Sequence, residues 1–137
     1  MTAITTERDT QRRDGKQAAF GVLAATKVLS GTIAVVTAAG FAQGGITSTT
    51  VKAVGVFDET VDNTAGANGE VKARTRKDGW FRFANSAAGD LITIADINTD
   101  CYIVDNQTVA KTNGTNTRAV AGKVRDVEAA GVWIEFP

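Results

Sequence analysis

Histidine is absent from this 137-residue chain, and cysteine, proline, methionine and tyrosine occur once each. Without histidine the chain lacks the usual general base, the Ser-His-Asp arrangement and the commonest metal ligand. The single cysteine, Cys101, cannot close an internal disulfide, so the fold does not depend on an oxidising compartment. Because Cys101 lies in the apolar run CYIV and has no histidine to activate it, we interpret it as a small buried hydrophobe.

An excess of charge is also missing, since 15 lysines and arginines balance 15 aspartates and glutamates. We therefore expect neither a nucleic-acid-binding protein, which usually carries a basic footprint, nor a surface that adheres to anionic membranes. The longest mostly apolar run, around residues 31–40, is interrupted by threonine and is too short to span a bilayer. The opening MTAITTERDTQRRDGK has no apolar core of a secretory signal, which predicts a protein made and kept in a cytosol.

What is present suits one domain with a single core, given the chain length and a hydrophobic content of 43%. Residues 1–18 differ from the rest because they are rich in charge and contain almost nothing to bury. We predict a polar N-terminal arm over 1–18, which is either a frayed end or short polar helix, or a segment that becomes ordered on a partner. A single β-domain is expected over 19–137.

From residue 19 onward, short runs of valine, isoleucine, threonine and aromatic residues alternate with glycine- and asparagine-rich turns. Closely spaced strands without a strand–helix rhythm predict an all-β fold, either a small barrel or a sandwich. The expected strands are Phe20–Leu29, Thr32–Thr37, Thr50–Phe57, Glu70–Thr75, Trp80–Ala84, Leu91–Ala95, Tyr102–Val104, Ala119–Asp126 and Val132–Phe136.

Two of these runs, WFRF at 80–83 and VWIEF at 132–136, place a tryptophan and a charge on the same face of a strand. Trp80 shares its face with Arg82, and Trp133 shares its face with Glu135. Each tryptophan lies either at the margin of the core or in a protein–protein interface, where tryptophan and arginine are enriched. The opposite faces predict the core residues Phe81, Phe83, Val132, Ile134 and Phe136.

The motifs that would carry chemistry are incomplete. Residues 96–100, DINTD, copy the start of a calcium-binding loop, but Cys101 replaces the required glycine and Gln107 the bidentate glutamate. The glycines of GFAQGG at 40–45 resemble a phosphate loop, yet no Lys-Ser/Thr pair follows. No feature selects a carboxylate pair for glycoside hydrolysis. We therefore expect no catalytic residues, no bound metal and no cofactor.

Several long segments resemble the cement or decoration proteins of tailed-bacteriophage heads. GDLITIADINTDCYIVDNQTVAKTNG and RAVAGKVRDVEAAGVWIEF are similar to the C-terminal half of such proteins. AAFGVLAATKVLSGTIAVVTAAGFAQGG and AVGVFDETVDNTAGANGEVKARTRKDGWFRFANSAAGD fit the same pattern, so the resemblance covers nearly the whole chain after the arm. It is carried by a succession of strand and turn phrases. It implies a small β-domain outside a capsid that bridges neighbouring capsomers as a homo-oligomer, often a trimer.

The leading hypothesis is therefore a structural virion protein on the capsid exterior, made in the host cytoplasm, that stabilises the head. Its expected partners are the major capsid protein and further copies of itself, with a trimer favoured and a dimer possible. A carbohydrate- or small-ligand-binding module that stacks its ligand on Trp80 or Trp133 is the alternative, and a hydrolase with an unidentified carboxylate pair is a distant third. The candidate interface residues are Arg8, Arg12, Arg13, Trp80, Arg82, Trp133 and Glu135.

Overall fold

A computed structural model describes residues 2–137, and nearly all of its regular structure is β. Two short 3-10 turns, η1 (Ala88–Asp90) and η2 (Ile94–Asp96), lie between the eighth and ninth strands. The strands are β1 (Gln17–Gly21), β2 (Thr26–Val28), β3 (Ile33–Val36), β4 (Ala42–Gly44), β5 (Lys52–Phe57), β6 (Val61–Asn63), β7 (Lys72–Arg76), β8 (Phe81–Phe83), β9 (Asp100–Ile103), β10 (Val109–Ala110), β11 (Val120–Glu128) and β12 (Gly131–Glu135).

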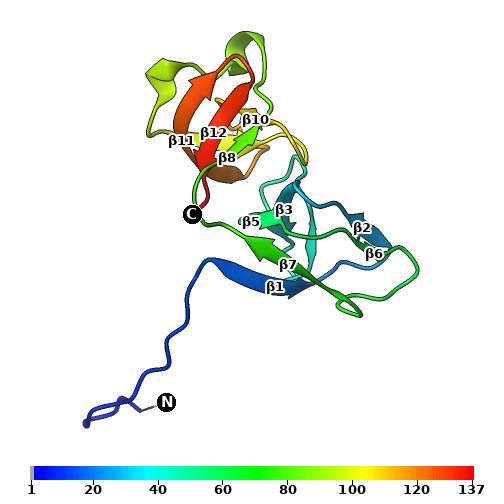
Figure 1. The fold of residues 1–137 in the computed structure, drawn as a ribbon, viewed down its shortest axis with the longest axis vertical. Coiled ribbons are helices and arrows are strands. Elements are labelled where there is room, and N and C mark those ends of the chain that lie inside the picture. Colours follow the sequence, from blue (N-terminus) through cyan, green and yellow to red (C-terminus); the bar gives the residue numbers. More distant parts are fainter. Residues whose placement is uncertain (1) are drawn as a thin grey trace.

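The strands form two five-stranded sheets and one two-stranded ribbon, and neighbouring strands pair antiparallel (Figure 1). The N-terminal sheet has the order β1-β7-β5-β3-β4, and the C-terminal sheet has the order β10-β9-β11-β12-β8. The ribbon pairs β2 with β6. The prediction of an all-β fold is confirmed. Of the two predicted architectures, a small barrel or a sandwich, the packed sheets fit the sandwich.

The main core lies between the two five-stranded sheets. Ile33 and Val35 of β3 join the buried residues of the C-terminal sheet, while Ala34 between them joins a smaller cluster with Val28 of the ribbon. This division follows from the period of two in a strand, which sends alternate side chains to opposite faces. The N-terminal sheet is therefore covered on both faces, by the C-terminal sheet on one side and by the ribbon on the other.

The predicted core residues are buried as expected. Phe83 and Phe136 are 6% exposed, Val132 and Ile134 are fully buried, and Phe81 is half-buried against the same cluster. The Phe136 ring lies 5.7 Å from that of Phe81 and 6.0 Å from that of Phe83, in tilted and edge-on arrangements that aromatic pairs favour. The interpretation of Cys101 as a buried hydrophobe is also confirmed, because its exposed fraction is zero.

Two of the predicted strands are wrong. Thr93 and Asp96 form a capping box that closes the turn η2, so Leu91–Ala95 is not a strand. Phe20–Leu29 splits into β1 and β2, because Ala25 has a positive φ of 54° and the backbone N–H of Ala24 donates to the Asn68 side chain rather than to a strand. The short strands β4, β6 and β10 were not predicted, since runs of two or three residues carry too little periodicity.

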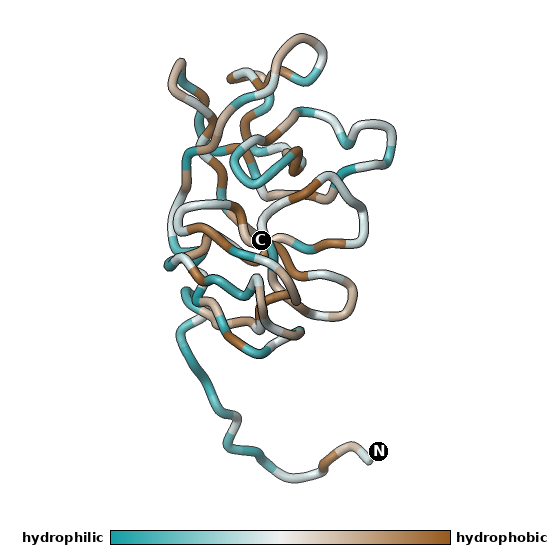
Figure 2. The backbone as a smooth tube through the Cα atoms, turned by 90° about the vertical axis from the view of Figure 1, so that its right-hand side faces the viewer, coloured by the Kyte–Doolittle hydropathy of each residue, from teal (hydrophilic) through white to brown (hydrophobic). Residues whose placement is uncertain are grey.

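The N-terminal arm is shorter than predicted. Strand β1 begins at Gln17, which pairs with Arg76, so the predicted boundary at residue 18 is two positions too late. Residues 2–16 contain no strand or helix, every one of them is exposed, and they run away from the domain (Figure 1). Figure 2 shows that this segment is mostly hydrophilic. The short polar helix is thus wrong for residues 2–16, and ordering on a partner stays a prediction.

Candidate interaction surface

The C-terminal sheet brings the two predicted pairs of surface residues together. Strand β8 is the edge strand beside β12, and Arg82 lies directly opposite Trp133 in their register. The Arg82 guanidinium carbon is 5.7 Å from the centre of the Trp133 ring, within the range of a cation–π contact. Residues 80–83 and 132–136 are far apart in the sequence, so only strand pairing could join them.

A β-bulge in the next strand adds a carboxylate to this surface. The register between β11 and β12 shifts between Val124 and Asp126, which leaves Arg125 as the extra residue and places Asp126 directly opposite Trp133. The displaced Arg125 donates from Nε to Glu135 Oε1 at 2.9 Å and from Nη1 to Asn98 Oδ1 at 2.7 Å, and its Nη2 forms an ion pair with Glu135 Oε1 at 2.7 Å. The Glu135 carboxylate is therefore the partner of Arg125 and is not grouped with the tryptophans.

Trp80 enters the surface from the turn before β8. The positive φ of Gly79, 88°, makes this turn, and the Arg76 guanidinium stabilises it by donating two hydrogen bonds to Asp78, at 2.9 and 3.1 Å. Trp80 is 53% exposed, whereas Trp133 is half-buried. Gly79, Trp80, Asp126 and Trp133 line a shallow open depression. We call Trp80, Arg82, Asp126 and Trp133 the aromatic face.

The charges around this face are unevenly paired. Arg82 Nη1 donates to Glu128 Oε1 at 3.1 Å, which ties the guanidinium to a carboxylate on β11. Asp126 is exposed, and within residues 2–137 it forms no ion pair; its Oδ1 accepts a hydrogen bond from the backbone N–H of Val127 at 2.8 Å. The aromatic face therefore presents two indole rings beside a carboxylate that has no cationic partner.

The structure thus joins some of the predicted interface residues and separates others. Trp80, Arg82 and Trp133 share the aromatic face, and Glu135 lies beside it. Arg8, Arg12 and Arg13 lie on the exposed arm, where the described part of the chain offers them no carboxylate within ion-pair distance. Sequence reasoning missed Asp126, because a regular strand would have sent it inward. The available signal was the run VRDV, in which two adjacent charges interrupt the alternation.

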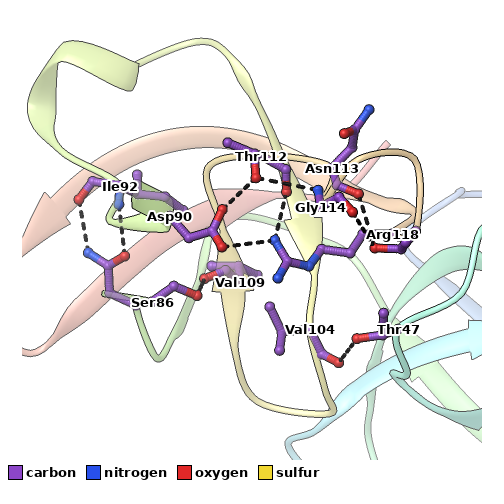
Figure 3. A network of polar contacts seen from close by, with 12 residues as sticks. Thr47, Ser86, Asp90, Ile92, Val104, Val109, Thr112, Asn113, Gly114 and Arg118 are labelled. Atoms are coloured by element: carbon purple, nitrogen blue, oxygen red, sulfur yellow. Dashed lines mark hydrogen bonds and ion pairs between the residues drawn. The ribbon is translucent and has the colours of Figure 1, made fainter. Parts of the chain in front are cut away.

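A polar network stabilises a different part of the C-terminal sheet, around η1 and the segment that follows β10 (Figure 3). Arg118 Nη1 donates to Asp90 Oδ2 at 3.2 Å and to the Thr112 backbone oxygen at 3.1 Å, and the Thr112 hydroxyl donates to Asp90. The hydrogen bond from Thr112, together with the one from Arg118, lowers the pKa of the Asp90 carboxyl. The Arg118 Nε is buried and has no hydrogen-bond partner among residues 2–137. These contacts join η1 to the segment after β10, and we interpret the network as structural.

Residues 96–100, which resemble the start of a calcium-binding loop, stabilise the local backbone through Asp96. The Asp96 carboxylate accepts a hydrogen bond from the backbone N–H of Thr93 at 2.8 Å and lies 3.8 Å from Lys111 Nζ. Within residues 2–137, no group of three or more Cys, Asp or Glu side chains is gathered as a metal site would require. Burial raises the pKa of the Cys101 thiol to about 12, so the thiolate is disfavoured at neutral pH.

Comparisons with family models, with curated proteins and with solved structures found no match for this chain. Over residues 2–137, none of the helical segments has the length and apolar character needed to cross a membrane. The aromatic face is therefore the candidate interaction site.

Proposed function

We propose that this protein is a structural component of a tailed-phage head, which binds the outer surface of the shell and bridges neighbouring capsomers. Its partners are the major capsid protein and further copies of itself, with a trimer favoured and a dimer possible. Its place is the exterior of the virion. The observation that carries the proposal is the aromatic face, because its residue types and its geometry suit contact with another protein.

The aromatic face has the composition of an interaction hot spot. Tryptophan and arginine are enriched among the residues whose truncation weakens protein–protein binding most. Trp133 and Arg82 alternate with the buried side chains of Val132 and Phe83, which hold both strands in place. Because strand pairing and these buried neighbours fix the backbone beneath the face, the face loses little backbone conformational entropy when a partner binds there.

The exposed arm supports the same proposal. Residues 2–16 supply hydrogen-bonding and charged groups but almost no apolar surface. Ordering a backbone costs about 1–2 kcal/mol per residue, and such a segment gains too little from burial in its own domain to offset that cost. A partner surface would supply the missing contacts, as expected of a protein whose role is attachment.

The direct test is co-sedimentation of the purified protein with undecorated heads of the phage that encodes it. We expect the intact protein to pellet with the heads and the double variant Trp80→Ala/Trp133→Ala to bind at least about 30-fold more weakly, as for loss of a hot spot. Leu29→Ala is the matched control. Leu29 is an exposed apolar residue (45%) that directly follows β2 of the ribbon and lies outside the aromatic face. Absence of the intact protein from the pellet would overturn the proposal.

A carbohydrate-binding module on the virion surface is the second candidate, and the open depression that Trp80 and Asp126 both line favours it. An exposed indole can stack on the apolar face of a sugar, while a carboxylate accepts hydrogen bonds from its hydroxyls. Titration with host-surface polysaccharide, followed by tryptophan fluorescence, tests this candidate. Saturable quenching that Trp80→Ala removes would favour it over the head-binding role, and no change at any concentration would exclude it for the polysaccharide tested.

A further inference from the structure

The aromatic face is suited to receive a guanidinium group. Two indole rings offer cation–π surface, and arginine stacks on such rings more often than lysine does. Asp126, directly opposite Trp133, offers a carboxylate that can accept charge-assisted hydrogen bonds. Arg82 already lies 5.7 Å from the centre of the Trp133 ring and donates to Glu128, so the groups left for another cation are the exposed Trp80 indole and the Asp126 carboxylate. The face therefore has room and unused charge for one more arginine.

The arm contains the complementary group. Arg12 and Arg13 are adjacent and exposed, and neither has an acidic partner within residues 2–137. In an extended chain, adjacent side chains point to opposite sides. One arginine of the doublet can therefore face a surface whichever side of the arm lies against it, which removes the need for an exact register.

The start of the arm directs it away from its own aromatic face. The backbone oxygen of Lys16 accepts from the N–H of Lys77 at 2.9 Å, which holds the base of the arm near the turn that leads to Trp80. A turn follows at once, where Asp14 Oδ1 accepts from the Lys16 N–H at 3.1 Å, and the arm then runs outward (Figure 1). Arg12 and Arg13 precede the first residue of β1 by five and four positions, so an extended chain carries them roughly 15 Å from the start of that strand.

We infer that the aromatic face binds the Arg12–Arg13 segment of the arm of a second copy, with one guanidinium on the Trp80 indole and against Asp126. The inference rests on the proposed use of this face for protein contact, but it does not depend on a phage head. The contact is head-to-tail, since one copy supplies the face and the next supplies the arm. Such contacts close into a ring when the rotation between copies permits it, as a trimer requires.

Mixing two variants tests the inference without any head present. One variant lacks residues 2–14, and the other carries Trp80→Ala/Trp133→Ala. We expect the intact protein to be oligomeric in analytical ultracentrifugation and each variant alone to sediment as a single chain. The equimolar mixture should contain a two-chain species, because the intact arm of one variant meets the intact face of the other.

Three outcomes would overturn the inference: an intact protein that stays a single chain, a variant that remains oligomeric by itself, or a mixture that does not associate. The first would also arise if each arm closed on its own face. Circular dichroism of each variant verifies that the β-fold is retained. Failure of the intact protein to bind heads, with association preserved, would sink the head-binding proposal while leaving this inference standing.

Charge reversal locates the contact within the arm. Arg12→Glu/Arg13→Glu should weaken self-association at least about 30-fold, the scale of a lost hot spot. Arg8→Glu is the matched control, because Arg8 is another exposed arginine of the same arm, and it should change association less than about threefold. Asp126→Arg combined with the double reversal should recover part of the loss. Equal loss with Arg8→Glu, or no recovery, would contradict the assigned contact.

Discussion

The two faces of strands β8 and β12 divide stability from contact. On the inner face, Phe83, Val132 and Ile134 are buried between the sheets. On the outer face, Arg82 contacts the ring of Trp133 on the solvent-exposed side of the sheet. The same backbone hydrogen bonds hold both faces, so only the side chains differ. The comparison teaches that a contact surface is rigid when the residues immediately before and after each surface residue are buried.

Truncation on the inner face should be the most damaging change. Phe83→Ala is expected to lower the free energy of unfolding by about 3–5 kcal/mol, because it removes a buried ring and leaves a cavity. Arg82→Ala, one residue earlier on the outer face, should cost less than about 1 kcal/mol, as for an exposed ion pair. Urea denaturation of both variants measures the difference. Equal midpoints for the two variants would show that the faces are not divided as described.

A glycine on the inner side of the sheet should be the next most sensitive position. A Cβ at Gly122 would lie 2.2 Å from the backbone oxygen of Glu135, so Gly122→Ala forces β11 and β12 apart. Overpacking of this kind costs about 1–3 kcal/mol. Gly89→Ala is the control, since a Cβ there meets nothing within 4 Å and should change stability by no more than about 0.5 kcal/mol. Thermal denaturation that ranks Gly89→Ala as the more harmful change would refute this.

The polar network around η1 should contribute stability that depends on pH. Hydrogen bonds from Thr112 and Arg118 lower the pKa of Asp90 in the folded state, so the folded protein binds a proton there less readily than the unfolded chain. The contribution is therefore complete above the unfolded pKa, about 3.9, and is lost as the pH falls through the lower folded value. Asp90→Asn should be less stable than the intact protein at neutral pH.

The two proteins should converge in stability as the pH falls below about 4, because the intact Asp90 then becomes protonated. Urea midpoints at a series of pH values measure this convergence. Asp105→Asn is a control on an exposed carboxylate outside the network, and its difference from the intact protein should be smaller. A difference for Asp90→Asn that stays constant over the whole series would show that the network does not act through the charge.

Removal of residues 2–14 should have the smallest effect on stability, within about 0.5 kcal/mol, because this exposed segment adds no core contact. The truncated domain should show the same circular dichroism and the same urea midpoint as the intact chain. In the intact protein, trypsin should cut first at Arg8, Arg12, Arg13 or Lys16 before the domain is degraded. A midpoint that falls clearly on truncation would mean that the arm packs against its own domain.

Much of the outer face could be predicted from the sequence, and its assembly could not. The period of two in WFRF and VWIEF correctly separated the buried residues from Trp80, Arg82 and Trp133. That β8 lies beside β12 depends on long-range pairing, for which neither run carries a local signal. The failed strand at Leu91–Ala95 has a related cause, since the hydrogen bond from the Thr93 N–H to Asp96 outweighs the apolar character of the run.

The sequence by itself determined the all-β class, the buried face of each long strand and the polarity of the arm. These features follow from side-chain size, charge and alternation over a few residues, which act locally along the chain. The tertiary structure alone decided that the arm ends before Gln17, where β1 begins, since backbone pairing with Arg76 requires no apolar side chain at that position. It also decided that Asp126 faces Trp133, because the bulge at Arg125 exists only where β11 pairs with β12.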